Sequence, residues 1–142
     1  MTQVNHKPIP AVVELTRPFW EGAHSGKLMM QKCSACGTMN FLPKPWCVDC
    51  GSRKLSWVEV RPTGKIYSYT IAYTVMMNYP GWAEDIPVIE GIIDLDDGGR
   101  LYAQIIDEDP SNARIGARVL AHFVKITENI GIPKFRIMKD EA

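Results

Sequence analysis

The sequence predicts a mainly β protein with short N-terminal helices, a small cysteine-held module and a five-stranded barrel. Three observations predict this class. All four cysteines lie between positions 33 and 50. Apolar and polar residues alternate along much of the second half, which is the period of a half-buried strand. Clusters of glycine, proline and aspartate separate these stretches, as turns require. We therefore expect a helical segment over residues 1–32, a ribbon over 33–58 and a barrel over 59–142.

The overall composition is that of a globular domain. The chain has 142 residues, of which 46% are hydrophobic and 23% are charged. This length suits one domain, or one domain with a small module attached. No apolar run reaches the ~20 residues that a membrane-spanning helix needs. The first ten residues lack the basic start and apolar stretch of a secretory signal. We expect a cytoplasmic protein without a membrane partner.

The first element is a short, interrupted helix within Glu14–Met30. Pro18 suits the first helical turn, and the following apolar residues have helical spacing. A short strand over 27–32 then leads into the cysteines. Phe19 and Trp20 are adjacent, so they point to different sides of a helix. They either pack on the chain's own core or contact a partner or an acyl-CoA ligand.

The cysteines form two CxxCG motifs, which are the strongest signal in the sequence. Cys33 and Cys36 make the first pair, Cys47 and Cys50 the second, and a glycine follows each pair. In such a turn the two sulfurs point at one place, and the glycine accepts the backbone angles that close the turn. Two facing turns supply four sulfurs to one tetrahedral ion. The spacer between the pairs contains Phe41–Pro45, which we expect to form a strand and then a turn.

This spacing indicates a zinc ribbon that holds one structural zinc ion. Disulfides are disfavoured because intracellular thiols stay reduced. Thioredoxin-like redox chemistry uses one CxxC beside a βαβ pattern, which this sequence lacks. Iron in a rubredoxin-like site stays open, because spacing does not choose the metal. Four thiolate ligands leave no open coordination position, so the metal is predicted to be structural.

The barrel is predicted from five strands that follow Leu55–Val60. Their expected ranges are 65–73, 88–95, 101–106, 116–125 and 134–138. The turn between the second and third contains Asp96-Asp-Gly-Gly99, a hairpin signal. Five short strands of this kind suit the OB fold, a Greek-key barrel, although an SH3-like barrel has similar counts.

The aromatic residues of the first barrel strand raise a nucleic-acid alternative. Strand periodicity places Tyr67, Tyr69 and Tyr73 on one face. Such a row resembles the platforms on which OB folds stack single-stranded bases. The charge argues against it. Residues 1–58 carry seven Lys or Arg and three Asp or Glu, whereas residues 59–142 carry nine and thirteen. The predicted barrel is thus net negative, the wrong sign for a phosphate backbone.

The segment 76–83 is too apolar for an ordinary solvated loop. It contains Met76, Met77, Tyr79 and Trp82. Methionine adapts to irregular surfaces, and Tyr and Trp anchor interfaces. The segment is therefore either a lid on the barrel's own core or a contact surface for a partner or acyl-CoA.

The sequence offers no convincing catalytic set. Three histidines are scattered, and no HExxH, GxSxG or phosphate-binding glycine loop is present. All four cysteines are assigned to the metal. We expect no catalysis by this chain alone.

Motifs along nearly the whole chain carry a resemblance to a known family. They are Pro18-Phe-Trp20, Gly26-Lys-Leu28, the two CxxCG pairs, Trp57, Gly64-Lys-Ile-Tyr-Ser-Tyr-Thr70, Ile86-Pro-Val-Ile89, Leu95-Asp-Asp-Gly98, Ile115-Gly-Ala-Arg-Val119 and Phe135. In this order they resemble the zinc-ribbon OB-fold family of acyl-CoA-associated proteins.

The resemblance implies a fold and a function. The fold would be an N-terminal helical hairpin, a rubredoxin-like ribbon and an OB domain, with Cys33, Cys36, Cys47 and Cys50 as metal ligands. Family members typically act as accessory subunits of thiolase-superfamily enzymes, and some accompany steroid side-chain aldolases or are fused to acyl-CoA hydratases. By resemblance, this chain would support assembly and acyl-CoA binding, while a thiolase-like partner supplies the catalytic residues.

Overall fold

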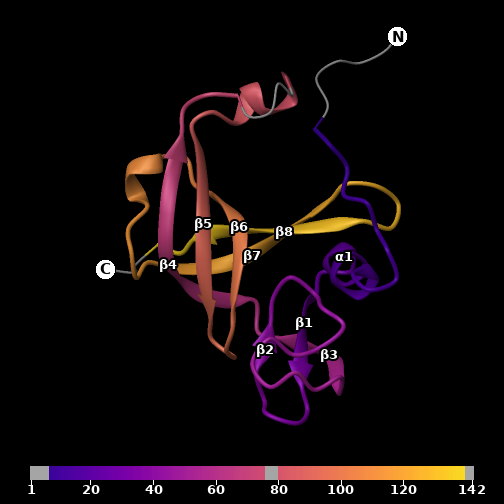
Figure 1. Ribbon diagram of the computed structural model, residues 1–142. Coiled ribbons are helices and arrows are strands. Elements are labelled where there is room, and N and C mark those ends of the chain that lie inside the picture. The colour runs from indigo at the N-terminus through magenta and orange to yellow at the C-terminus, as the bar shows by residue number, and fades with distance from the viewer. Residues whose placement is uncertain (1–6, 76–79, 140–142) are drawn as a thin grey trace.

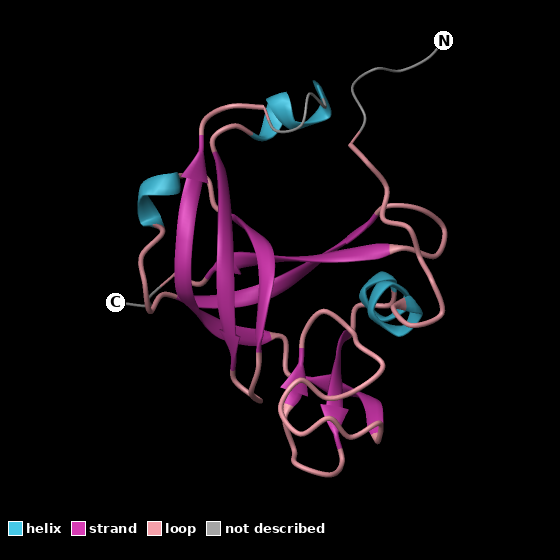
Figure 2. Cartoon of the chain, viewed as in Figure 1, coloured by secondary structure: helices cyan, strands magenta, loops and turns pink. Residues whose placement is uncertain are grey.

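The computed structural model describes residues 7–75 and 80–139. One short α-helix, α1 (Arg17–His24), precedes a small three-stranded sheet and a five-stranded barrel (Figures 1 and 2). The mainly β architecture and the order of its parts confirm the predicted fold class. The helix lies within the predicted range Glu14–Met30 and ends at His24, and Gly26 follows with a positive φ of 79°. The short strand predicted over 27–32 is present and begins at Leu28. Within the described residues α1 is the only α-helix, so the implied helical hairpin is reduced to one helix.

The small sheet has the order β2-β1-β3 and contains the cysteine turns. Its strands are β1 (Leu28–Cys33), β2 (Met39–Asn40) and β3 (Leu55–Val60). β1 pairs antiparallel with β3 along its whole length and with β2 at two positions. The predicted spacer strand was displaced, because the strand ends at Asn40 and the chain bends from Phe41 onward.

The barrel closes in the order β4-β5-β6-β8-β7. Its strands are β4 (Thr63–Ala72), β5 (Val88–Leu95), β6 (Arg100–Ile106), β7 (Arg118–Lys125) and β8 (Gly131–Ile137). β7 returns to pair with β4, which makes the first four strands a Greek key. β8 closes the barrel between β7 and β6, and its pairing with β6 is parallel. The 3₁₀ helices η1 (Pro80–Asp85) and η2 (Pro110–Asn112) lie in the connections.

β8 begins three residues earlier than predicted because Pro133 does not end it. Proline has no backbone N–H to donate to a neighbouring strand, so it is tolerated where one side of the strand has no partner. At Pro133 the strand pairs only with Phe123 of β7, and the pairing with β6 starts at Phe135. One side of β8 is therefore an edge at that position, where proline is tolerated.

A β-bulge in β4 overturns the predicted tyrosine face. The register with β5 shifts between Ile66 and Ser68, which leaves Tyr67 as the extra residue. Strict alternation is broken there, so residues before and after the bulge reverse faces. Tyr67 is 46% exposed, whereas Tyr69 packs against the core. Tyr73 lies beyond the end of β4. The three rings therefore form no common platform.

One apolar core joins the ribbon and the barrel. Phe135, Val119 and Ile93 are fully buried in the barrel, and Leu28 and Met30 of β1 belong to the same cluster. The hairpin between β5 and β6 lies beside the ribbon (Figure 1). Gly99 on this hairpin has φ 88°, and a Cβ there would lie 2.7 Å from Met39 Cβ. The hairpin and the ribbon thus meet by close backbone approach.

The helix is fixed to the barrel by a second close approach. A Cβ at Gly131, the first residue of β8, would lie 2.3 Å from the backbone nitrogen of His24. Only glycine permits this contact between the end of α1 and the start of β8. Among the described residues, no helix has the length and apolar character needed to cross a bilayer.

Candidate metal centre

The four cysteine sulfurs converge at the tips of two facing turns. All four lie within 4.8 Å of one another, and the Cys33–Cys50 and Cys36–Cys47 sulfur pairs are each 3.6 Å apart. Ligands about 2.3 Å from a tetrahedral zinc ion are separated by about 3.8 Å. A disulfide requires a separation of about 2.05 Å. The spacing therefore fits a tetrahedral metal site and excludes disulfides between these pairs.

The sequence folds locally into two matching turns that aim the sulfurs. The N–H of Gly37 donates to Cys33 O at 2.8 Å, and the N–H of Gly51 donates to Cys47 O at 3.0 Å. Gly37 and Gly51 have φ of 82° and 76°, which glycine adopts without strain. The first cysteine of each pair is buried and the second is exposed. The glycine role inferred from CxxCG is therefore correct.

Backbone N–H groups favour the thiolate form of the two buried cysteines. The N–H of Cys50 and then that of Asp49 lower the pKa of the Cys47 thiol to about 6. The N–H of Cys36 likewise lowers the pKa of Cys33. The N–H of Ser52 acts in the same direction on Cys50, but the three neighbouring sulfurs raise the pKa of Cys50 to about 12. Four thiolates this close require a cation to offset their repulsion, and a zinc ion bound by them would supply that charge.

Two buried amides hold the spacer around the sulfurs, and sequence reasoning missed both. Asn40 is 2% exposed, donates to Cys47 Sγ at 3.6 Å, and accepts from the N–H of Val48 at 2.9 Å. Gln31 is 4% exposed and exchanges two hydrogen bonds with the backbone of Lys44, at 3.0 and 3.1 Å. Their signal was available, because a polar residue inside an apolar stretch beside metal ligands often orients them.

The predicted contact residues are distributed over separate parts of the molecule. Phe19 is 9% exposed, and its ring lies 5.1 Å from Trp20 and 5.9 Å from Phe41. Trp82 lies in η1, with Lys7 Nζ 4.8 Å from its ring. Figure 1 shows η1 and α1 well apart. Met76, Met77 and Tyr79 fall outside the described residues.

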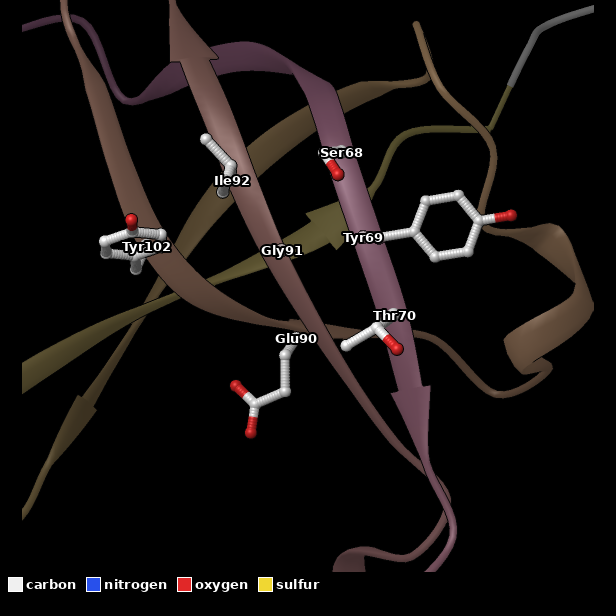
Figure 3. A pocket seen from close by; sticks show the side chains of 7 residues that line it. All are labelled: Ser68, Tyr69, Thr70, Glu90, Gly91, Ile92 and Tyr102. Atoms are coloured by element: carbon white, nitrogen blue, oxygen red, sulfur yellow. The ribbon is translucent and has the colours of Figure 1, made fainter.

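The outer face of β4, β5 and β6 carries a shallow depression of about 270 Å³. Seven residues line it: Ser68, Tyr69, Thr70, Glu90, Gly91, Ile92 and Tyr102 (Figure 3). The ring of Tyr69 points away from Tyr102 across the view, and Gly91 contributes no side chain. The depression therefore lacks the stacked aromatic rings that single-stranded bases require.

Comparison with known proteins assigns both halves of the chain. The family model of the ChsH2 rubredoxin-like zinc ribbon domain matches residues 20–56, which include all four cysteines. The family model of the ChsH2 C-terminal OB-fold domain matches residues 57–124. The second match identifies the barrel as an OB fold rather than an SH3-like barrel.

Two relatives that carry functional names match most of this chain. A DUF35 domain-containing scaffold protein of Methanocaldococcus jannaschii is 32% identical over 69% of this chain and 68% of its own length. A probable enoyl-CoA hydratase alpha subunit of Thermomonospora curvata is 30% identical over 92% of this chain, which spans only 40% of that relative.

Solved structures show the same fold. A structure titled Ltp2-ChsH2(DUF35) aldolase has a TM-score of 0.76 and 29% identity, over 91% of this chain and 98% of that one. A DUF35 protein of unknown function from Sulfolobus solfataricus has a TM-score of 0.58 at 20% identity, covering 88% and 86% of the two chains, and shows the fold alone. With its four-sulfur ribbon and its closed barrel, the chain belongs to the ChsH2 (DUF35) family of zinc-ribbon OB-fold proteins.

Proposed function

We propose that this chain is a non-catalytic, zinc-binding accessory subunit of a cytoplasmic, heteromeric thiolase-superfamily complex that acts on acyl-CoA. One observation carries the proposal. The chain superposes on nearly all of a chain from the Ltp2-ChsH2(DUF35) aldolase, at 29% identity. Two further relatives are named as alpha subunits of hydratases, from Thermomonospora curvata and Mycobacterium tuberculosis. These names describe proteins that work with other subunits.

The metal site supports a structural contribution rather than chemistry. Cys33, Cys36, Cys47 and Cys50 would hold the ion, and a four-sulfur set fills a tetrahedral zinc site. Bound zinc supplies the charge that holds the four thiolates together. The residues of this chain orient those sulfurs through backbone N–H groups and through Asn40. No coordination position is left for water or substrate.

The barrel supports the same assignment, because its interior is filled. Phe135, Val119 and Ile93 have 0% exposure, and Ile66, Leu101 and Ile105 have 1%. A barrel packed in this way presents only its outer surface to a ligand or a partner. The chain would therefore act by holding or completing a site on another subunit.

The proposal is tested by isolating the tagged full-length chain from its native cells and identifying the co-eluting proteins by mass spectrometry. We expect a thiolase-superfamily protein in stoichiometric amount. The matched control is the Cys36→Ser/Cys47→Ser double variant, which loses the metal ligands and should recover far less partner. Recovery of nucleic acid, or of no stoichiometric protein, would contradict the proposal.

A further inference from the structure

The exposed ligand Cys36 depends on one side chain for support. Among the described residues, the only non-cysteine side chain that hydrogen-bonds to its sulfur is Thr38, whose hydroxyl oxygen lies 3.2 Å from Cys36 Sγ. The buried ligand Cys47, by contrast, lies inside the ribbon and receives the amide of Asn40. Thr38 is therefore the side chain best placed to control the solvent-facing ligand of the first turn.

The hydroxyl of Thr38 also reaches the second cysteine turn. It donates to a carboxylate oxygen of Asp49 at 2.8 Å, and Asp49 stands between Cys47 and Cys50 in the sequence. This hydrogen bond spans 11 positions of the chain and joins the two turns directly. A hydrogen bond to an ionised carboxylate is roughly twice as strong as one between neutral groups. One hydroxyl group thus bridges the two halves of the metal site.

The backbone fixes both ends of this bridge. The C=O of Thr38 accepts from the N–H of Cys33 at 2.9 Å and from the amide of Asn40 at 3.3 Å. The N–H of Asp49 donates to Cys47 Sγ at 3.4 Å. Threonine is branched at Cβ, so rotation about its χ1 is restricted. The hydroxyl is therefore held toward the site by the same hydrogen bonds that shape the two turns.

The shared hydroxyl suits a site filled with anions. A cysteine that binds zinc does so as a thiolate, which accepts hydrogen bonds and has none to donate. Thr38 supplies one hydroxyl proton, and its neighbours Cys36 and Asp49 would then both be negatively charged. A donor placed between two anions offsets part of their repulsion, so the bridge holds the two turns together at their exposed side.

We propose that Thr38 and Asp49 are positioning residues that keep the exposed sulfur of Cys36 on the zinc ion. The inference rests on the zinc-binding part of the proposed function and names the residues that control how firmly the ion is held. Cys36 faces solvent, where a chelator or an alkylating reagent has access. Loosening the bridge should therefore open the site at this ligand first.

The first test measures zinc affinity by competition with a colorimetric chelator, using the full-length chain at one fixed pH. Thr38→Val keeps the branched shape and removes the hydroxyl, and we expect it to bind zinc about tenfold more weakly, as when a hydrogen bond to a metal ligand is lost. Thr38→Ser restores the hydroxyl and should stay within about twofold of the wild type. The matched control is Thr70→Val, the same substitution at an exposed threonine of the barrel, which should change nothing.

A second measurement separates the positioning of Cys36 from general loosening of the ribbon. The zinc-loaded chain is treated briefly with iodoacetamide, and the cysteine modified first is located by mass spectrometry. Cys50 is the internal control, because it is exposed as Cys36 is and has no hydrogen bond to Thr38. We expect Thr38→Val to raise the initial modification of Cys36 and to leave that of Cys50 close to the wild-type value.

Asp49 provides an independent variant at an exposed position, where truncation leaves no cavity. Asp49→Asn keeps an acceptor oxygen for Thr38 and should retain more zinc affinity than Asp49→Ala. The two residues act through one hydrogen bond. Combining Thr38→Val with Asp49→Ala should therefore cost little more affinity than Thr38→Val alone.

The outcomes distinguish the bridge from the proposed function. Wild-type zinc affinity in Thr38→Val and Asp49→Ala would overturn the bridge and leave the zinc site standing. Failure of Thr38→Ser to restore affinity, or equal initial modification of all four cysteines in Thr38→Val, would do the same. A wild-type chain that binds no zinc would overturn both the bridge and the zinc-binding part of the proposed function.

Discussion

The ribbon and the barrel reach a stable structure by different means. The barrel buries a continuous apolar core and pairs its exposed arginines with aspartates. The ribbon is too small to bury a core of its own. Its buried residues are the metal ligands Cys33 and Cys47, two amides, and apolar side chains such as Leu28 and Met30 that join the barrel's cluster. A metal held by the four cysteines would therefore do in the ribbon what apolar burial does in the barrel.

Both parts expose apolar side chains, but on different foundations. In the ribbon, Leu42, Trp46 and Val48 are each at least half exposed although the module is small. The barrel also exposes Ile115 and Tyr102, at 71% and 64%, but has a filled interior beneath its surface. Coordination of a metal would thus let the smaller part fold without burying its apolar side chains.

The largest effect is expected from breaking the metal site. In Cys47→Ser we expect loss of bound zinc and unfolding of the ribbon, because structural zinc supplies on the order of 10 kcal/mol of binding free energy coupled to folding. The barrel should keep much of its β signal. Metal content and circular dichroism together check this. Full metal retention with an unchanged melting curve would contradict the four-cysteine site.

The converse variant breaks the barrel. Phe135 is fully buried among β-strand side chains, so Phe135→Ala should lower the free energy of unfolding by about 3–5 kcal/mol. The measurement is urea denaturation of the zinc-loaded chain. Met138→Ala, at a 44% exposed position nearby in the sequence, serves as the control and should change little. Equal effects from both variants would refute the core assignment.

A smaller effect is expected from the amide that supports Cys47. Asn40→Ala removes the donor to Cys47 Sγ and the acceptor for Val48. We expect zinc affinity to fall about 10–100-fold, as when a supporting hydrogen bond to a ligand is lost. Competition with a colorimetric chelator measures it. Asn129→Ala changes an exposed asparagine outside the ribbon and should bind zinc as the wild type does. Unaltered affinity in Asn40→Ala would remove Asn40 from the site.

The smallest effect is expected on the stability of the barrel in acid, when the ion pair between Asp96 and Arg118 is removed. Arg118, and then Thr63, hold the pKa of Asp96 well below its usual range. A depressed folded-state pKa adds stability above the unfolded pKa of about 3.9, and that stability is lost as pH falls below it. Asp96→Asn should therefore be less stable than the wild type at pH 6, with the difference shrinking below pH 4. A difference that grows in acid would contradict this pairing.

The sequence predicted the parts that depend on spacing and period. The two CxxCG motifs located the metal site, and alternation located five barrel strands to within a few residues. It did not predict the bulge at Tyr67, because a bulge is set by pairing with β5 and leaves no local signal. It also did not predict that β2 ends at Asn40, since that strand is fixed by pairing with β1.

Surfaces that depend on tertiary packing are harder to predict from the sequence. The sequence directed attention to 76–83, where an apolar run stands out locally. A groove between the ribbon and the barrel combines Leu42 and Val48 with Tyr102, which are distant in sequence and meet only when the ribbon packs on the barrel. No single window of the sequence contains it.

The most direct test of the account is acyl-CoA turnover in a reconstituted system. The zinc-loaded chain, the thiolase-superfamily subunit recovered with it, and their complex are assayed separately. The account predicts no turnover by the chain alone and higher turnover by the complex than by the isolated partner. Turnover by the chain alone, or a partner whose rate is unchanged when the chain is added, would contradict it.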